Sequence, residues 1–517
     1  MQQGDAQGEG ESALRPAVEP YAWYGLGVLM LVYVLNFVDR QLLTILAPAL
    51  KRDLGISDSD FGFLYGTAFG VFYALFGIPL GRLADRWIRV RLLALGLALW
   101  SAMTALSGFA RGFGELAAAR IGVGVGEASA SPCAYSLIGD WFPPHRRATA
   151  LAIYSAGLYI GAGVSLFLGS SISQAWDGAF RAGDAPLGLA GWQAAFMAVG
   201  LPGVLLAVWV ATLREPVRNH LKTAAPGSEG EAGPGLWSGF LRDLSVIVPP
   251  FTLWGAARRG RGAFAANIGL VLLAALAAWG LTALFGDPPQ WIALALGCYA
   301  LASWASDLRD KEPAAFRAVF GSRPFLAVVI GYGLVSLVGY AGTAFGPLYV
   351  IEAFGMDPNH VALIIGGMGA VGGGLGVITG GALADRLAMT QGESGRVLVL
   401  LLAATLSFAA HALIFTTQSV PILYVGIFAG WFLTSATLGG ASGAIVGMVA
   451  PHLRGLATAT FIVGTTLIGL ALGPYAAGKL AQTLGSLREG LLGVLAVAPL
   501  SIGLLALAWR DMVRRRG

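Results

Sequence analysis

Long apolar segments separated by short polar connectors run along most of this 517-residue chain. Each is about 20 residues long or more, the length that an α-helix needs to cross a bilayer. Six segments come first, then two, then six, and they lie near 22–48, 60–81, 91–111, 114–139, 148–173, 190–213, 264–285, 289–306, 324–350, 360–384, 396–416, 420–449, 455–478 and 490–509. The pattern predicts an all-α membrane protein with fourteen membrane-spanning helices.

The composition supports this prediction and excludes a soluble protein. Hydrophobic residues make up 56% of the chain and charged residues only 12%, against roughly 25% charged in a soluble protein. Glycine occurs 75 times, which suits membrane helices that approach one another closely through small residues. The two cysteines, Cys133 and Cys298, lie in apolar segments far apart in the sequence, so we interpret them as packing residues.

The basic residues are sorted by side, which predicts the orientation. With the N-terminus placed inside, 25 of the 33 lysines and arginines fall on that side, six fall on the other, and Arg40 and Arg120 lie within spans. Cytoplasmic loops carry such an excess of positive charge, so we expect both termini in the cytoplasm. The net charge of +5 therefore reflects topology and not a nucleic-acid partner. Residues 1–20 are polar and acidic, as in a short disordered tail rather than a signal peptide.

The two groups of six spans repeat one another. GRLADR at 81–86 recurs as GALADR at 381–386, after the second span of each half. PHRRATA at 144–150 recurs more loosely as PHLRGLA at 451–457, between the fourth and fifth spans. A parallel duplication of this kind is typical of transporters built from two related bundles. We therefore expect two six-helix bundles with an inserted two-helix hairpin.

The expected organisation has five parts. A cytoplasmic tail (1–20) is followed by a six-helix bundle (21–213) and a central cytoplasmic loop (214–323), which contains the inserted hairpin (264–306). A second six-helix bundle (324–510) and a basic tail (511–517) complete the chain. Both ends of the hairpin are cytoplasmic, so it leaves the orientation of the second bundle unchanged.

Four ionisable residues interrupt the apolar spans of the first half. Asp39 and Arg40 lie late in the first span, and Arg120 and Glu127 lie in the fourth. A charge at the bilayer centre costs at least about 2.5–3.5 kcal/mol and usually marks a functional site. Arg120 and Glu127 are two helical turns apart and share one face, with Glu127 about 10 Å deeper. We expect the four charges to converge in the outer half of a central cavity.

Two loop and helix motifs give the chain a family resemblance. Gly81, Asp85, Arg86, Arg89 and Arg91 resemble the loop signature of the major facilitator superfamily. NFVDRQ, with Asn36, Asp39 and Arg40, and RIGVGVGEA, with Arg120, Gly124, Gly126 and Glu127, are similar to the spinster branch of that superfamily. The resemblance covers the first half well and the second half only at the level of the superfamily.

The loop signature implies a cytoplasmic gate. In this resemblance the glycine lets helices two and eleven approach, and the charged side chains bridge neighbouring helix ends, with Asp140 as a partner for one of the arginines. The gate residues that we expect are Gly81, Asp85, Arg86, Arg89, Asp140, Asp385 and Arg386.

The spinster resemblance implies a secondary transporter, acting as a monomer, for a lysophospholipid or sphingoid phosphate, with protons as the coupling ion. Arginine keeps its charge, which suits binding of phosphate or carboxylate, whereas a carboxylate can exchange a proton. We therefore predict Glu127 and then Asp39 as proton-coupling groups. The residues that we predict to bind substrate are Arg40, Arg120, Asn36, Tyr340, Phe345 and Trp431.

Several alternatives remain open. Symporters of hexuronates and related acids also carry an Asp-Arg pair late in helix one, and a purely structural ion-pair network would explain the same four charges. The aromatic wall, which also includes Tyr332 and Phe432, could serve ordinary helix packing. His411 lies in the ninth span, which is usually peripheral, so we assign it no coupling role.

Other classes of function are disfavoured. The glycine-rich stretch 367–376 lies within a span and follows no strand, so it is no nucleotide loop. No P-loop, metal-ligand cluster or catalytic triad emerges, so we expect neither an enzyme nor a cofactor. The absence of targeting signals, together with the Gly/Ala/Arg-rich composition, suggests a bacterial inner membrane.

Overall fold

The computed structural model describes residues 18–180, 184–217 and 235–514, and these are almost entirely helical. Most of the predicted N-terminal tail and the last three residues of the basic tail lie outside the described residues. Thirteen helices in the described ranges are long and apolar enough to cross a membrane. The remaining predicted span, 114–139, which is the fourth along the chain, is divided into two shorter helices, α5 and α6, on either side of Ala128 and Ser129.

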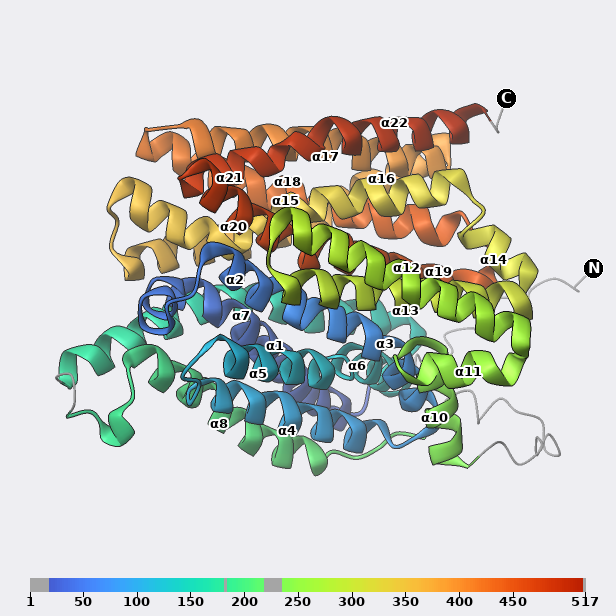
Figure 1. Ribbon diagram of the computed structural model, residues 1–517, viewed down its shortest axis with the longest axis horizontal. Coiled ribbons are helices and arrows are strands. Elements are labelled where there is room, and N and C mark those ends of the chain that lie inside the picture. The colour runs from blue at the N-terminus through green and yellow to red at the C-terminus, as the bar shows by residue number, and fades with distance from the viewer. Residues whose placement is uncertain (1–17, 181–183, 218–234, 515–517) are drawn as a thin grey trace, which may run out of the picture.

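The first half forms one bundle, drawn in blue to blue-green in the lower part of Figure 1. Its elements are α1 (Pro20–Leu54), α2 (Asp58–Gly62), the π-helical turn η1 (Phe63–Thr67), α3 (Ala68–Arg86), α4 (Arg89–Ser107), α5 (Phe113–Glu127), α6 (Ala130–Trp141), α7 (Pro144–Ala179), the short turn η2 (Pro186–Gly188) and α8 (Gly191–Ala211).

The second half forms the other bundle, in yellow to red in the upper part of Figure 1. Its elements are α15 (Arg323–Phe354), α16 (Pro358–Gln391), α17 (Glu393–Thr416), α18 (Val420–Gly447), the short turn η3 (Pro451–Leu453), α19 (Arg454–Thr465), the π-helical turn η4 (Thr466–Ala471), α20 (Gly473–Leu484), α21 (Leu487–Val494), η5 (Leu495–Val497) and α22 (Ala498–Arg514).

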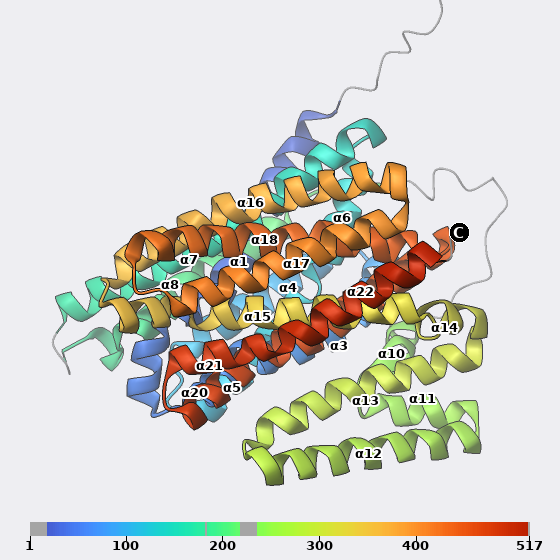
Figure 2. The ribbon, with the colours of Figure 1, turned by 90° about the horizontal axis from the view of Figure 1, so that it is seen from above.

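An inserted unit connects the two bundles. It consists of α10 (Leu236–Ile247), α11 (Phe251–Arg259), the long hairpin of α12 (Arg261–Phe285) and α13 (Pro288–Lys311), and α14 (Pro313–Val319). The hairpin lies against one side of the molecule, as the view in Figure 2 makes clear, and α12 is its outermost helix. The α12 surface is lipid-like in character, since Leu272, Leu276 and Trp279 are all more than 60% exposed.

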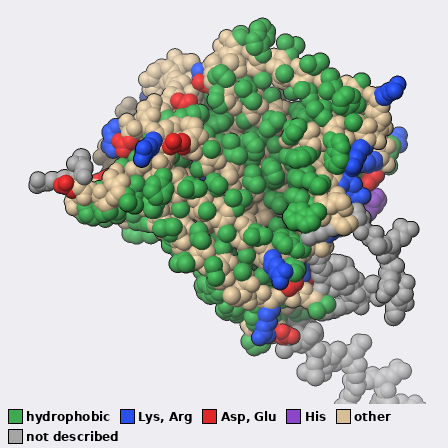
Figure 3. Space-filling model, turned by 60° about the horizontal axis from the view of Figure 1, so that its bottom comes forward, with side chains coloured by type: hydrophobic (Ala, Val, Ile, Leu, Met, Phe, Trp, Pro, Cys, Tyr) green, Lys and Arg blue, Asp and Glu red, His purple; other side chains and the backbone are tan. Residues whose placement is uncertain are grey.

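The two ends of the helices are distinguished below by the chain termini. The end that holds Pro20 and Arg514 is called the terminus-bearing end, and the opposite end, with α2 and α20, is called the far end (Figure 1). Between them the surface is broadly apolar, and charged side chains gather towards its margins (Figure 3). This distribution is that of a protein surrounded by hydrocarbon along its middle.

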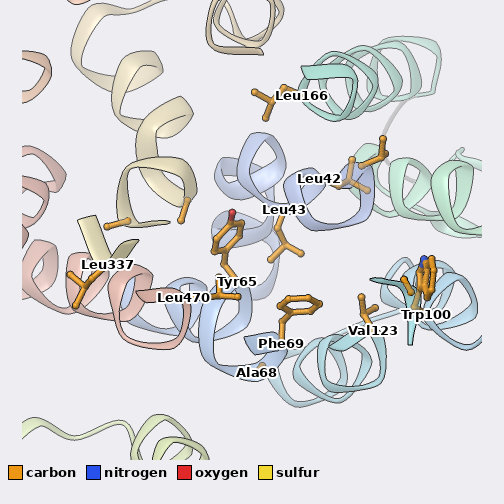
Figure 4. Packing of buried hydrophobic residues seen from close by; sticks show 14 of the residues in the cluster. Leu42, Leu43, Tyr65, Ala68, Phe69, Trp100, Val123, Leu166, Leu337 and Leu470 are labelled. Atoms are coloured by element: carbon orange, nitrogen blue, oxygen red, sulfur yellow. The ribbon is translucent and has the colours of Figure 1, made fainter. Parts of the chain in front are cut away.

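Glycines allow the helices of the first bundle to pack closely. A Cβ at Gly96 would meet Ser129 and the carbonyl of Gly126, and a Cβ at Gly124 would meet the carbonyl of Phe69. The GVGVGE stretch is therefore a helix-packing surface on α5, in keeping with its position in a span. Figure 4 shows the result, with Phe69 packed among Leu43, Val123 and their neighbours.

The two bundles touch in the middle and at the far end. Gly163 of α7 meets Gly366 of α16 backbone to backbone, and the Asn359 amide nitrogen donates to Gln174 at 2.8 Å. At the far end α2 packs on α20, where a Cβ at Gly62 would meet the backbone of Pro474. The bundles are thus held together on the side away from the termini.

Candidate functional site

A cavity of about 260 Å³ lies between the two bundles. Residues of α1, α7, α15, α16, α17 and α18 line it, so both halves of the chain contribute. Apolar and aromatic groups form most of its surface, while Gln41, Ser336, Thr343 and Thr434 supply hydroxyl or amide groups. A concave, mostly apolar site with a few polar groups is typical of a small-molecule binding site.

The charged pair Arg40 and Glu127 lies directly behind the cavity wall. The Arg40 Nε donates to Glu127 Oε2 at 2.6 Å, which joins α1 to α5. The Glu127 side chain is fully buried, whereas the Arg40 side chain keeps 17% of its exposure. Phe37, three residues before Arg40, and Gln41, directly after it, both line the cavity. Arg40 is therefore the member of the pair that solvent can reach.

Aromatic rings surround the Arg40 guanidinium. Its Cζ atom lies 5.1 Å from the ring centroid of Phe37, 4.6 Å from that of Phe69 and 4.8 Å from that of Tyr73. A cation over an aromatic face is stabilised electrostatically, and more strongly when water is excluded. The rings thus hold the cation in place by contacts that leave most of its N–H groups available to an anion.

Arg120 shares this aromatic environment. Its Cζ lies 5.4 Å from the Phe69 ring, so one ring contacts both arginines, and its Nε donates to the Leu64 carbonyl at a long 3.5 Å. The side chain is 1% exposed. Among the described residues no ion pair within 4.0 Å joins it to a carboxylate. The structure therefore brings Arg120 beside the Arg40–Glu127 pair without joining it to that pair.

Asp39 points away from Arg40, towards α4, as expected for adjacent helical residues about 100° apart. It is completely buried, and the polar groups that face it are the Trp100 indole and the Thr104 hydroxyl. Within the described part of the chain, neither Asp39 oxygen has a partner that meets hydrogen-bond geometry, and the same is true of Glu127 Oε1 and Asn36 Oδ1. A buried carboxylate without such partners is costly when charged.

The predicted aromatic residues occupy different places. Tyr340 and Trp431 line the cavity, as does Tyr332. Phe345 does not; it is fully buried, and its ring packs against Phe61 with the centroids 5.2 Å apart. Asn36 is 1% exposed and also lies behind the wall.

His411 lines the cavity although α17 is a peripheral helix by sequence order. Its imidazole ring reaches inward between Gly342 of α15 and Gly430 of α18, neither of which has a side chain to block it. Its Nδ1 lies 2.8 Å from the Ser407 carbonyl, which fixes the ring and leaves Nε2 for another partner. The sequence signal for this arrangement, two glycines on neighbouring helices, becomes visible only once the helices are aligned in space.

The predicted gate residues of the first half form ion pairs at the terminus-bearing end. Arg89 pairs with Asp140, as the sequence suggested, and also with Glu215 at 2.7 Å. Arg86 pairs at 2.8 Å with Asp243, a residue of the inserted helix α10 that sequence reasoning missed. Asp85 is exposed.

The other gate residues also find partners within their own half or remain on the surface. Asp385 pairs with Arg396 of α17 at 3.0 Å, and Arg386 is exposed. Gly81 was expected to face helix eleven, but a Cβ at this position would contact only Pro132 of α6. The ion pairs named here thus link helices within the first half, within the second half, or between the first half and the inserted unit.

The two linked bundles, their shared cavity and the buried charges beside it define a membrane transporter rather than an enzyme. The chain belongs to the Major Facilitator Superfamily, whose family model matches residues 29–392. This is the architecture that the duplicated motifs predicted.

Three relatives illustrate where the chain lies within this superfamily. An MFS-type efflux pump of Mycolicibacterium smegmatis is 28% identical over 90% of this chain and 85% of its own length. Spinster homolog 1 of Xenopus laevis is 26% identical over 88% of this chain and 72% of its own. A hexuronate transporter of Bacillus subtilis is 28% identical, but over only 40% of this chain and 46% of its own.

Among solved structures, a bacterial homologue of the human lysosomal transporter spinster, in an inward-facing and unoccupied conformation, superposes with a TM-score of 0.69. The alignment covers 96% of this chain and 99% of that one, at 22% identity. At this level of identity the likeness establishes the shared fold.

Proposed function

We propose that this protein is a proton-coupled secondary transporter of an amphiphilic anion, a lysophospholipid or sphingoid phosphate, that works by alternating access. The motifs of helices one and four support this proposal, and so does the similarity to spinster homolog 1 over 88% of this chain. The transporter acts as a monomer in a bacterial inner membrane, with both termini in the cytoplasm. The far end, where α2 packs on α20, then faces outward.

The observation that carries the proposal is the Arg40–Glu127 ion pair beside the cavity. Arg40 is a permanent cation with a partly exposed side chain, its neighbours Phe37 and Gln41 line the site, and its acidic partner is fully buried. A proton on Glu127 removes the charge that holds Arg40, so the guanidinium becomes available to a phosphate or carboxylate. Loss of that proton restores the ion pair, and the pair then competes with the bound anion.

Asp39 and Arg120 complete this mechanism. Arg120 adds a second fixed cation beside Phe69, which favours a substrate that carries more than one anionic oxygen. Asp39, buried without a hydrogen-bond partner, is the second group at which a proton binds. Opposite these charges, Tyr340 and Trp431 offer an apolar surface for the start of an acyl chain.

A second candidate is proton-linked symport of small organic acids such as hexuronates. The volume of the cavity suits it, because about 260 Å³ lies at the small end of the range for small-molecule sites. The hexuronate transporter among the relatives also supports it. In this case Arg40 and Arg120 bind a carboxylate and the aromatic wall binds the carbon skeleton.

Reconstitution in liposomes with an imposed pH gradient separates the two candidates. Uptake of a labelled lysophospholipid is compared with uptake of a labelled hexuronate, for the wild type and Glu127→Gln. Gradient-dependent lipid transport that disappears in the variant supports the first candidate. Hexuronate uptake without lipid transport supports the second, and equal transport by the wild type and the variant would show that the ion pair is structural.

A further inference from the structure

The inserted unit touches both bundles, and its contacts are polar as well as apolar. We propose that it is a brace across the seam between the α2–η1–α3 span and the α19–η4–α20 span, and that Gln290 of α13 stabilises the state in which the far end is closed. The inference requires alternating access, which the fold provides, but it does not depend on the identity of the substrate or on proton coupling.

The polar centre of the brace is a buried group of three residues, which come from η1 of the first bundle, α13 of the inserted unit and η4 of the second bundle. Gln290 is 1% exposed, and its Oε1 accepts a hydrogen bond from the Thr67 hydroxyl at 2.6 Å. The same hydroxyl lies 2.5 Å from the Ala471 carbonyl oxygen, towards which Gln290 Nε2 donates at 3.4 Å. Thr67 has a single proton for two acceptors, so the Gln290 amide supplies the second donor that the Ala471 carbonyl can use.

Both bundles have a π-helical turn at this point. Thr67 is the last residue of η1 in the first half, and Ala471 is the last residue of η4 in the second. A π-helical turn interrupts the regular hydrogen-bond ladder, and it is found most often where a helix has a functional role. Gln290 therefore bridges the two bundles at the place where each helix departs from regular geometry.

Asp287, at the tip of the hairpin, is attached to the second bundle. Asp287, between α12 and α13, pairs with Lys479 at 2.9 Å and accepts a hydrogen bond from the Tyr475 hydroxyl at 2.9 Å. The Trp291 ring packs edge-on against Tyr475, with centroids 5.3 Å apart. These contacts lie on α20, near the far end, so the hairpin moves with that helix.

The base of the inserted unit is attached to the first bundle instead. Asp243 of α10 is 4% exposed at its side chain and pairs with Arg82 at 3.0 Å and with Arg86 at 2.8 Å. Between base and tip, Gly297 allows α13 to approach both Val71 of α3 and Leu467 of η4. The unit thus has one attachment on each bundle and an apolar strip across both.

Opening the far end requires α2 and α20 to separate. Because Asp287 holds the hairpin to α20, the hydrogen bonds of the Thr67 hydroxyl, to Gln290 and to the Ala471 carbonyl, must break during this separation. A buried hydrogen bond contributes on the order of 1 kcal/mol net, which corresponds to about a fivefold change in a two-state equilibrium. Loss of the bond is therefore expected to shift the population towards the far-end-open state by about fivefold.

Distance measurements between spin labels test the brace directly. Labels are placed at Leu187 and Leu484, exposed positions at the far end of the first and second bundle, in a chain with Cys133 and Cys298 replaced by serine. Gln290→Leu and the near-isosteric Thr67→Val are compared with the parent. Leu276→Ala, on the lipid-facing surface of α12, is the matched control within the hairpin.

We expect both variants to enrich the long-distance population about fivefold, and the double variant to add less than the sum of the two, because both side chains belong to one hydrogen-bonded group around the Ala471 carbonyl. The control should match the parent. An unchanged distance distribution in folded, monodisperse Thr67→Val would overturn the proposal, and this conservative variant decides the matter if Gln290→Leu fails to fold. A shift confined to Gln290→Leu, absent from Thr67→Val, would also overturn it.

Discussion

Arg40 and Glu127 form a 2.6 Å ion pair between α1 and α5 in which the acid is fully buried and the base keeps a partly exposed side chain. This difference in exposure matters because an anion can reach the base more readily than the acid, whereas a proton on the acid alters what the base can bind. Removing the charge of one partner in such a buried pair has a large effect, since the remaining charge loses its compensation.

Glu127→Gln tests the acid. The variant keeps the shape of the side chain but can neither carry a proton nor hold Arg40 by charge, so we expect uptake driven by a pH gradient to fall at least tenfold while substrate binding persists and loses its pH dependence. Flux assays and binding titrations at two pH values measure the two effects. Glu115→Gln, an exposed position on the same helix, should behave as the wild type. Full gradient-driven flux in Glu127→Gln would contradict the assignment.

Arg40→Lys tests the base. Lysine preserves the charge but lacks the planar group that packs among Phe37, Phe69 and Tyr73 while donating to Glu127. We expect substrate affinity to fall about tenfold, a cost of roughly 1.4 kcal/mol. Arg52→Lys serves as the control, because this side chain of α1 is 72% exposed. If Arg40→Lys bound substrate as tightly as the wild type, charge alone would be sufficient at this position.

Asp39→Asn should change stability in a direction opposite to that of Asp140→Asn. Asp39 has no hydrogen-bond partner in the described part of the chain, so the amide removes a buried negative charge and should raise the melting temperature. Asp140→Asn removes a carboxylate that pairs with the buried Arg89, so it should lower the melting temperature. Thermal unfolding of both variants in one detergent makes the comparison. A lower melting temperature for Asp39→Asn would indicate that its charge is compensated.

His411→Gln should weaken substrate binding without altering proton coupling. The imidazole lines the cavity through Nε2, and loss of one hydrogen bond typically corresponds to about 1 kcal/mol, or about a fivefold loss of affinity. The dependence of flux on the pH gradient should remain that of the wild type. His360→Gln is the control, since His360 contacts Tyr424 near the far end and not the cavity. A loss of gradient dependence in His411→Gln would assign the residue to coupling instead.

The sequence predicted the parts of this molecule that depend on spacing along one helix. Span lengths and repeated motifs predicted the two bundles, and the two-turn separation of Arg120 and Glu127 placed both on one face of α5. Contacts between helices were harder to predict. Phe345 and Tyr340 lie on the same helix, yet one packs against Phe61 and the other faces the cavity, because the rotation of a uniformly apolar helix leaves no periodic signal.

The inserted unit was the least predictable part for the same reason. Its hairpin was recognised by hydropathy, but Asp243 and Gln290 gave no sign of their partners, which lie more than 150 residues away in the chain. Long-range pairing of single polar residues depends on how the elements dock, and local sequence carries no information about that docking.

The ion pairs of Asp243 restrict how the sequence of such a chain can evolve. Arg82 and Arg86 share this one carboxylate, and α13 covers the apolar strip beside them on α3. A shortened descendant that lost residues 236–319 would leave two cations without their partner and a membrane helix with an unmatched surface. Charge and apolar surface on α3 are now matched to the insertion, so its loss would favour compensating substitutions along that helix.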